Sequence, residues 1–232
     1  MKAPKALLDR LEKIAIELPS IGFSKLKLVV LLSQLGDFDS IEYAQALVVE
    51  LPKLQKSNIE LIAIGIGSKE SAERFCSYTG FPKQCLFADS EPIIHQDLGL
   101  YPGLKIAGGP WLGLLLMCAG IGSPGTLKEV LRGYSGDRSA PQRLDTKMFE
   151  LAGGNGFQRP FELATVRLKN MVEVLGAWST YVETDKFLTQ RGGTYLLNQK
   201  NELIYEFKDK GILGFSETMA SPLKFLENFL VN

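Results

Sequence analysis

Histidine and cysteine, the residues that carry much of enzyme chemistry, are scarce in this chain of 232 residues. A single histidine, His95, argues against a histidine-based metal site. The three cysteines, Cys76, Cys85 and Cys118, are odd in number and irregularly spaced, so they form no disulfide framework. We therefore expect a reducing, cytoplasmic or stroma-like setting, with neither a metal nor a cofactor.

Net charge and long hydrophobic runs are also missing. The 26 basic residues balance the 26 acidic ones, whereas a protein that mainly binds nucleic acid needs a basic surplus. The longest nearly apolar stretch, 111–122, falls short of the roughly 20 residues of a membrane span. We interpret it as a buried segment and leave contact with a membrane surface open. The first 20 residues are typical of an amphipathic helix, not of a signal peptide.

Strand and helix patterns alternate along the first hundred residues. The apolar runs predict buried strands at 25–33, 59–68 and 84–90, and the segments that follow them predict helices at 40–51, 69–81 and 93–103. This alternation predicts a parallel β-α-β core with helices on both faces of the sheet.

The second half of the chain changes character. Glycine-rich and proline-containing sequence with broken helical pieces precedes a helix, a hairpin around NQKN and a final helix. These are predicted at 103–157, 159–178, 192–207 and 217–231, with a helical piece at 126–134 and a surface loop at 136–145. A parallel unit followed by an antiparallel hairpin is the order of the thioredoxin fold. We predict one α/β domain over 1–232, with 103–190 as a mostly helical insertion.

The sequence GIGSPG at 120–125 satisfies the glycine spacing of a dinucleotide-binding turn. The apolar run before it contains Gly113 and Met117 and lacks the β-branched residues of a strand. We interpret it as a tight turn into a helix and keep nucleotide binding as an alternative.

Two cysteines flank the sequence TGFP, and both are candidates for thiol chemistry. Cys76 and Cys85 have Arg74 and Lys83 nearby in sequence, and basic neighbours favour a thiolate. The competing interpretation is that both thiols are inert or buried. Cys118 lies in the apolar run and is predicted to belong to the core.

The turn GDFDS at 36–40 joins the first predicted strand to the helix that follows it. Asp39 with Glu42 three residues later fits a capping-box-like pattern, which predicts a helix start. The same place, a helix N-terminus after a buried strand, is where a thioredoxin-fold enzyme holds its thiol.

On these residues, the chain resembles the peroxiredoxin-like proteins of the AhpC/TSA group, especially the peroxiredoxin-like 2 branch and its cyanobacterial and plastid relatives. The resemblance places Asp37 and Ser40 where that branch carries the two cysteines of C-x-x-C. It also covers FPKQCLFADSEPIIHQDLGL (81–100) and RGGTYLLNQKNELIYEFKDK (191–210), with Gly192 and Gly193 at the cis-proline position of thioredoxins.

The resemblance implies thiol-dependent reduction of peroxides or disulfides, but Asp37 and Ser40 lack the thiol that this chemistry uses. Two hypotheses follow. In the first, the chain is a thiol-dependent oxidoreductase with a relocated thiol at Cys76 or Cys85. In the second, it is a binding or assembly module whose insertion, 103–190, meets a protein partner. The candidate contacts for an acidic partner are Arg132, Arg138, Arg143 and Arg159.

Overall fold

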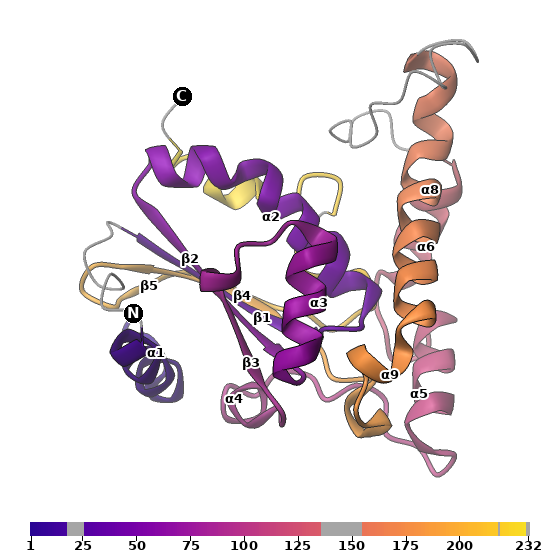
Figure 1. Cartoon of the computed structure of the whole chain (residues 1–232), viewed down its shortest axis with the longest axis horizontal. Coiled ribbons are helices and arrows are strands. Elements are labelled where there is room, and N and C mark those ends of the chain that lie inside the picture. Colours follow the sequence, from indigo (N-terminus) through magenta and orange to yellow (C-terminus); the bar gives the residue numbers. More distant parts are fainter. Residues whose placement is uncertain (18–25, 136–154, 218, 231–232) are drawn as a thin grey trace.

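A five-stranded mixed sheet forms the centre of the protein, in a computed structural model that describes residues 1–17, 26–135, 155–217 and 219–230 (Figure 1). The strands are β1 (Leu26–Gln34), β2 (Ile59–Ile66), β3 (Leu86–Asp89), β4 (Gly193–Asn198) and β5 (Leu203–Lys208). Their order is β3-β2-β1-β4-β5. Strands β1, β2 and β3 are parallel, whereas β4 runs antiparallel to both β1 and β5. The predicted β-α-β core and terminal hairpin are confirmed, and the architecture is thioredoxin-like.

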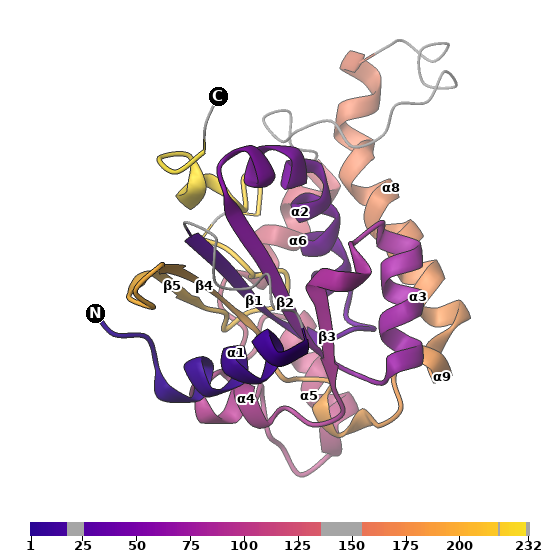
Figure 2. The same ribbon diagram turned by 60° about the vertical axis from the view of Figure 1, so that its left-hand side comes forward.

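Helices cover both faces of this sheet. The α-helices are α1 (Lys5–Glu17), α2 (Phe38–Lys56), α3 (Lys69–Thr79), α4 (Ile93–Asp97), α5 (Gly109–Cys118), α6 (Thr126–Ser135), α8 (Asn155–Gly176) and α9 (Trp178–Tyr181). Three 3-10 turns are η1 (Lys83–Cys85), η2 (Asp185–Phe187) and η3 (Lys224–Leu226). Helices α2 and α3 lie on one face of the sheet, and α1 and α4 lie on the other (Figure 2).

The alternation of side chains along β1 builds a core on each face of the sheet. Leu28, Val30 and Leu32 pack with residues of α2 and α3. Val29 and Leu31 point the other way and pack with residues of α1 and α4. Every residue of β1 is buried, as expected for a parallel strand that is covered on both sides. This double burial fixes the carboxyl end of β1, from which the 36–40 turn leaves.

Helix α2 begins and ends outside its predicted bounds. Its N-cap is Asp37, whose side chain accepts a hydrogen bond from the backbone N–H of Asp39 at 3.3 Å. The prediction that Asp39 caps the helix is therefore wrong by two residues. The helix also continues through Pro52 and ends only at Lys56.

The final predicted helix, 217–231, is not a helix in the structure. The described part of that segment holds only the short turn η3, Lys224–Leu226. Pro222 interrupts the segment, because proline lacks an N–H and clashes with the helical turn before it. The apolar periodicity has another use, since the ring of Phe225 stacks on Tyr205 with centroids 4.1 Å apart.

The helices of the predicted insertion segment, 103–190, form a further layer outside α2 and α3 (Figures 1 and 2). Polar side chains of α8 and α2 contact one another. Arg167 Nε donates to Glu42 Oε2 at 2.8 Å, and Gln45 Nε2 donates to Asn170 Oδ1 at 3.0 Å. Helix α6 packs against α8, and α5 lies next to α6. The loop predicted at 136–145 lies outside the described residues.

The interpretation of 111–122 as a buried segment is only partly right. Met117 and Gly113 of α5 are buried, but Trp111, Leu112 and Leu115 are exposed. Only one side of α5 packs against the rest of the protein. Its other sides also carry apolar residues, and these remain exposed. Within the described chain, no helix has both the length and the apolar character that crossing a bilayer requires.

Candidate functional site

The turn 36–40 lies at the carboxyl end of β1, at the N-terminus of α2. The side chains of Asp39 and Ser40 are fully buried, and that of Asp37 is 14% exposed. The dipole of α2 favours negative charge here. This is the position that a thioredoxin-fold enzyme gives to a thiolate, and here two carboxyl groups occupy it.

Arg191 is the partner of both carboxyl groups and is itself completely buried. Its Nη2 donates to Asp37 Oδ2 at 2.5 Å, and its Nη1 donates to Asp39 Oδ2 at 2.9 Å. Its Nε donates to the carbonyl oxygen of Thr189 at 3.2 Å. A buried guanidinium is tolerated only when such partners surround it, and these partners hold the 189–191 segment against the start of α2.

The glycines after Arg191 allow this approach. Gly193 is the first residue of β4 and pairs with Leu31 of β1. A Cβ atom at Gly192 would lie 2.0 Å from the carbonyl oxygen of Leu31, so the backbone comes too close to β1 for any side chain. The assignment of Gly193 to the cis-proline position stays a prediction, but the segment does lie beside the 36–40 turn.

Asp39 is the more deeply buried of the two acids. Its Oδ2 also accepts a hydrogen bond from the backbone N–H of Leu213 at 2.5 Å, whereas Oδ1 has no hydrogen-bond partner among the described residues. Burial raises the pKa of Asp39 well above its ordinary value, the charge of Asp37 raises it further, and Arg191 opposes the rise. Asp39 therefore tends to hold a proton.

A third acid, Asp209, joins this cluster from the residue after β5. Its Oδ1 accepts a hydrogen bond from the backbone N–H of Gly211 at 2.9 Å, and its side chain is almost wholly buried. Burial raises the pKa of Asp209 to about 7, against the opposing charge of Arg191. Burial alone would lower the pKa of Arg191, but Asp37, Asp39 and Asp209 raise it overall. One guanidinium thus faces three carboxyl groups, and protonation accommodates the excess.

Ser40 has no activating base. Ser33 Oγ donates its hydrogen to Asp37 Oδ2 at 2.7 Å, so the 2.9 Å contact between Ser33 and Ser40 requires Ser40 to be the donor. The histidine, His95, is buried, and its Nε2–H donates to the carbonyl oxygen of Leu32 at 2.7 Å. Burial lowers the pKa of His95 to about 4. Serine nucleophiles need a base within hydrogen-bond reach, and Ser40 instead holds the turn in place.

The two candidate catalytic thiols lie away from this cluster. Cys85 precedes β3 and neighbours Leu86, which is level with Ala63 and hence with Val30 in the middle of β1. Five or so residues of strand separate that level from the turn, on the order of 15 Å. Cys76 lies near the C-terminus of α3, close enough to Cys85 for the two thiols to interact electrostatically.

Neither of these thiols is activated. Burial raises the pKa of Cys76 to about 11, which the nearby charge of Lys83 only partly offsets. Burial, followed by the charge of Glu60, raises the pKa of Cys85. Reactive cysteines have a lowered pKa, so the geometry gives no support to the relocated-thiol hypothesis at these two positions.

Cys118 is placed differently from its prediction. It ends α5 and is exposed, so the expectation of a core residue is wrong. The charges of the cluster also act on Cys118. Partial desolvation of its thiol raises its pKa, Asp39 and Asp37 raise the pKa further, and Arg191 lowers it. The preceding residue, Met117, packs with Leu213, whose N–H is bonded to Asp39.

The glycine motif at 120–125 connects two helices. Helix α5 precedes it, where a dinucleotide fingerprint requires a strand. Gly120, Gly122 and Gly125 all have positive φ angles, as tight turns require. The side chains of Ser123 and Thr126 accept hydrogen bonds from the backbone N–H of Ile212, which ties the turn to the fold. The motif lacks the context on which the nucleotide-binding alternative depended.

The structure describes only one of the four arginine side chains that were predicted to contact an acidic partner. Arg132 Nε donates to Glu129 Oε2 at 2.8 Å and is therefore not a free contact for an acidic partner. Arg138 and Arg143 lie outside the described residues, and the side chain of Arg159 is not described. In the parts of the chain that the structure describes, no three His, Cys, Asp or Glu side chains are placed to hold a metal ion.

Sequence reasoning missed Arg191 and Asp209 as members of the site. Both come from the terminal hairpin, more than 150 residues after the turn they meet. The available signal was a charged residue directly before the paired glycines in RGGTYLL and another directly after the last strand.

The fold and this site define an α/β protein of the thioredoxin-like class, with an ionic cluster at the N-terminus of α2. A family model described as "AhpC/TSA antioxidant enzyme" matches residues 46–211, most of the chain, so the protein belongs to this family. The match begins after the 36–40 turn. A search of curated proteins and a search of solved structures each gave no match.

Replacing Asp209 by asparagine should change how stability depends on pH. The native carboxyl keeps its proton up to about pH 7, whereas the unfolded chain releases it near pH ~4. In that window the native state binds the extra proton, so the free energy of unfolding falls as pH rises. Asp209 causes a decrease of at most about 4 kcal/mol in the free energy of unfolding across this window. The Asp209→Asn variant should lack this decrease, and urea unfolding at several pH values between about 4 and 7 measures the difference.

His95 serves as a control because it should change stability with pH in the opposite direction. Its native pKa of about 4 lies below that of an unfolded histidine, about 6.5, so the unfolded state binds the extra proton and stability rises with pH. His95→Gln should therefore steepen the fall that Asp209→Asn removes. Identical pH profiles in the two variants would contradict the assignment of these protons.

Proposed function

We propose that this chain is a peroxiredoxin-like member of the AhpC/TSA family in which the position of the catalytic thiol holds a structural ion cluster. Asp37 and Ser40 take the places of the two cysteines, and Arg191 locks the turn. The protein then contributes to redox or antioxidant processes as a binding module and not by thiol catalysis. It is a single thioredoxin-like domain, and its insertion, 103–190, is the interaction surface. Three free cysteines suit a reducing, cytoplasmic compartment.

The observation that carries this proposal is the closure of the helix N-terminus. Arg191 Nη1 and Nη2 each donate to a carboxyl group of the turn, and the hydroxyl of Ser40 is engaged by Ser33. An incoming peroxide would meet no thiolate there, and the guanidinium of Arg191 and the hydroxyl of Ser40 already bind neighbouring groups.

The wild-type protein should consume hydrogen peroxide, in the presence of dithiothreitol, no faster than a blank without protein. The physical reason is the absence of an activated thiol at α2 and the raised pKa of Cys76 and Cys85. A coupled or dye-based peroxide assay measures the rate. Turnover above the blank would contradict the proposal.

A second candidate function is a thiol-dependent oxidoreductase, and the observation in its favour is the exposure of Cys118. The thiol is exposed and lies within the electrostatic reach of Asp39, Asp37 and Arg191. Its raised pKa predicts activity mainly at alkaline pH, where the thiolate forms. If turnover appears, its loss in Cys118→Ser would establish this function, and its loss in Cys76→Ser or Cys85→Ser would establish the relocated-thiol hypothesis.

A further inference from the structure

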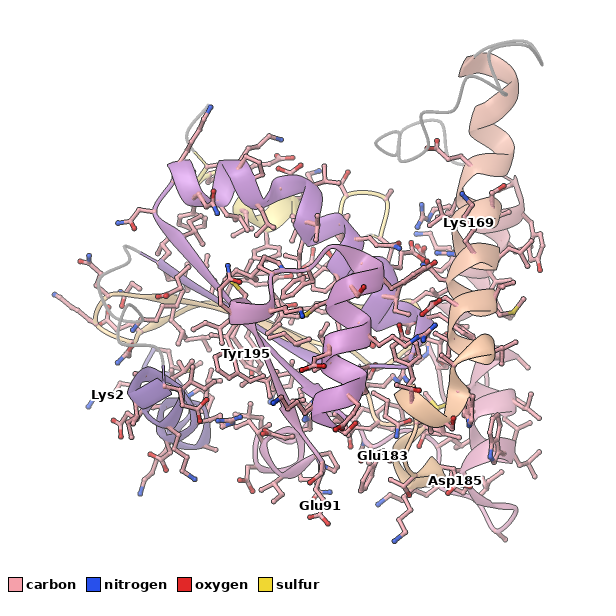
Figure 3. All side chains as sticks on the ribbon, viewed as in Figure 1. Lys2, Glu91, Lys169, Glu183, Asp185 and Tyr195 are labelled. Atoms are coloured by element: carbon pink, nitrogen blue, oxygen red, sulfur yellow. The ribbon has the colours of Figure 1, made fainter. Side chains whose placement is uncertain are left out.

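The helices of the insertion segment carry an apolar outer surface. Figure 3 shows side chains standing out from α5, α6 and α8 on the side away from the sheet. The large apolar residues exposed there, called here the insertion face, are Trp111, Leu112, Leu115, Ile121, Leu127, Leu131, Tyr134, Leu168, Met171, Val172 and Leu175. They include most of the exposed large apolar side chains of the described chain. A surface of this kind marks an interaction site.

On two of these helices, the exposed apolar residues recur at helical spacing and form a stripe that faces away from the sheet. Helix α6 exposes Leu127, Leu131 and Tyr134, and α8 exposes Leu168 and Leu175 with two apolar neighbours between them. Residues at these intervals share one side of a helix. The opposite sides already pack inward, so the fold itself does not use the exposed stripes.

The charges on these helices have one sign at the surface. Lys128 of α6 and Lys169 of α8 are exposed, and Lys169 is labelled in Figure 3. The acidic residues of these helices are engaged in ion pairs. Glu129 pairs with Arg132, and Glu173 pairs with Arg74 on α3. Glu162 is buried. In the described parts of α5, α6 and α8, the exposed charges are therefore basic.

The stretch between Lys105 and Lys128 strengthens this pattern. It contains no charged residue, includes all of α5, and is flanked by an exposed lysine at each end. Two aromatic residues, Trp111 of α5 and Tyr134 of α6, are also exposed, although one side of the Trp111 ring packs on Trp178. Apolar helix sides, interfacial aromatics and lysines are the composition of helices that lie in the plane of a bilayer surface.

A second copy of the chain is a less suitable occupant. Two-fold pairing of the insertion face would bring the lysines of both copies, Lys128 and Lys169, into one contact, and like charges would oppose it. An anionic lipid surface accepts these same lysines and attracts them. The exposed acids Glu183 and Asp185 lie past α9, at the lower end of the layer in Figure 3, and limit the contact on that side.

We propose that the insertion face docks peripherally on an anionic lipid bilayer, with its apolar side chains at the headgroup level and its lysines among the lipid phosphates. This inference rests on the proposed function, in which the insertion is the interaction surface, and it names the partner. The contact is reversible, because the helices lie on the bilayer and none of them crosses it.

Flotation with vesicles tests the proposal on the full-length protein. Wild type should float with vesicles of phosphatidylcholine mixed with phosphatidylglycerol and remain below with phosphatidylcholine alone. The double variant Lys128→Glu/Lys169→Glu should reduce binding to mixed vesicles at least about tenfold. Leu131→Glu/Val172→Glu should do the same, by placing charge in the apolar contact.

Val49→Glu/Ile204→Glu is the matched control, since both residues are exposed apolar side chains outside the insertion. It should bind as wild type does, and circular dichroism should show all variants folded. Failure of wild type to float, or equal loss in the control, would overturn the lipid proposal. A dimer in light scattering that Leu131→Glu/Val172→Glu dissociates, without vesicle binding, would replace lipid by a second copy. Either outcome leaves the peroxide assay unaffected.

Discussion

Replacing Arg191 by methionine should lower the free energy of unfolding by about 3–5 kcal/mol. Methionine fills much of the space of the arginine stem but donates no hydrogen bond. The carboxyl groups of Asp37 and Asp39 and the carbonyl of Thr189 would then each lose the donor that Arg191 supplies in a buried place. Leaving buried polar groups without partners costs far more than the net strength of a hydrogen bond. Urea denaturation followed by circular dichroism gives the value.

Arg74→Met is the matched control. Arg74 makes a similar ion pair with Glu173 at 2.7 Å, but its side chain is 44% exposed. An exposed pair contributes only about 0–1 kcal/mol, so the control should lose little. Equal losses in the two variants would show that burial does not set the importance of Arg191.

Neutralising the acids distinguishes charge from packing. In Arg191→Met/Asp37→Asn/Asp39→Asn, no ionised carboxylate remains at the N-terminus of α2, and part of the lost stability should return. A triple variant that is no more stable than Arg191→Met would mean that the guanidinium acts through shape alone.

Local patterns predicted the sheet because burial on both faces imposes its own composition. The run KLKLVVLLS could only be a covered strand, and the observed strand is displaced from the prediction by one residue. The hairpin followed from NQKN between two apolar runs, and it closes between β4 and β5. In both segments the information is local: it lies within 9 residues for the strand and within 16 residues for the hairpin.

The site could not be predicted in the same way, because its contacts join distant segments. Nothing near Arg191 in sequence shows that it points at Asp37 and Asp39, about 150 residues earlier. The same limitation explains Cys118: an apolar run predicts burial, but only tertiary packing decides which side of α5 is covered. The last helix was predicted wrongly from its apolar periodicity: Pro222 disfavours helix only in the residues before it, and after it the described chain forms only the turn η3.

Asp37→Cys should create the reactive thiol that the wild-type turn lacks. A cysteine at this N-cap would take the place of a carboxylate that accepts from Arg191 Nη2 and from the N–H of Asp39. Both donors, together with the dipole of α2, stabilise a thiolate. Burial raises the pKa of Asp39, which weakens its opposition to a thiolate at this turn. The thiol pKa should therefore fall below the free value of about 8.5.

Ser68→Cys separates the effect of the helix from that of the arginine. Ser68 is the N-cap of α3, where its hydroxyl accepts from the N–H of Ser71 at 3.2 Å, and its described contacts include no arginine. We expect the thiol of Asp37→Cys to have a pKa at least about one unit lower than that of Ser68→Cys, a roughly tenfold difference in thiolate near neutral pH. The rate of alkylation against pH, resolved by peptide mass spectrometry with Cys118 as internal reference, measures both pKa values.

Peroxide should then oxidise the new thiol of Asp37→Cys faster than that of Ser68→Cys. Equal pKa values would mean that Arg191 does not activate a thiol at this turn and contributes only to the fold.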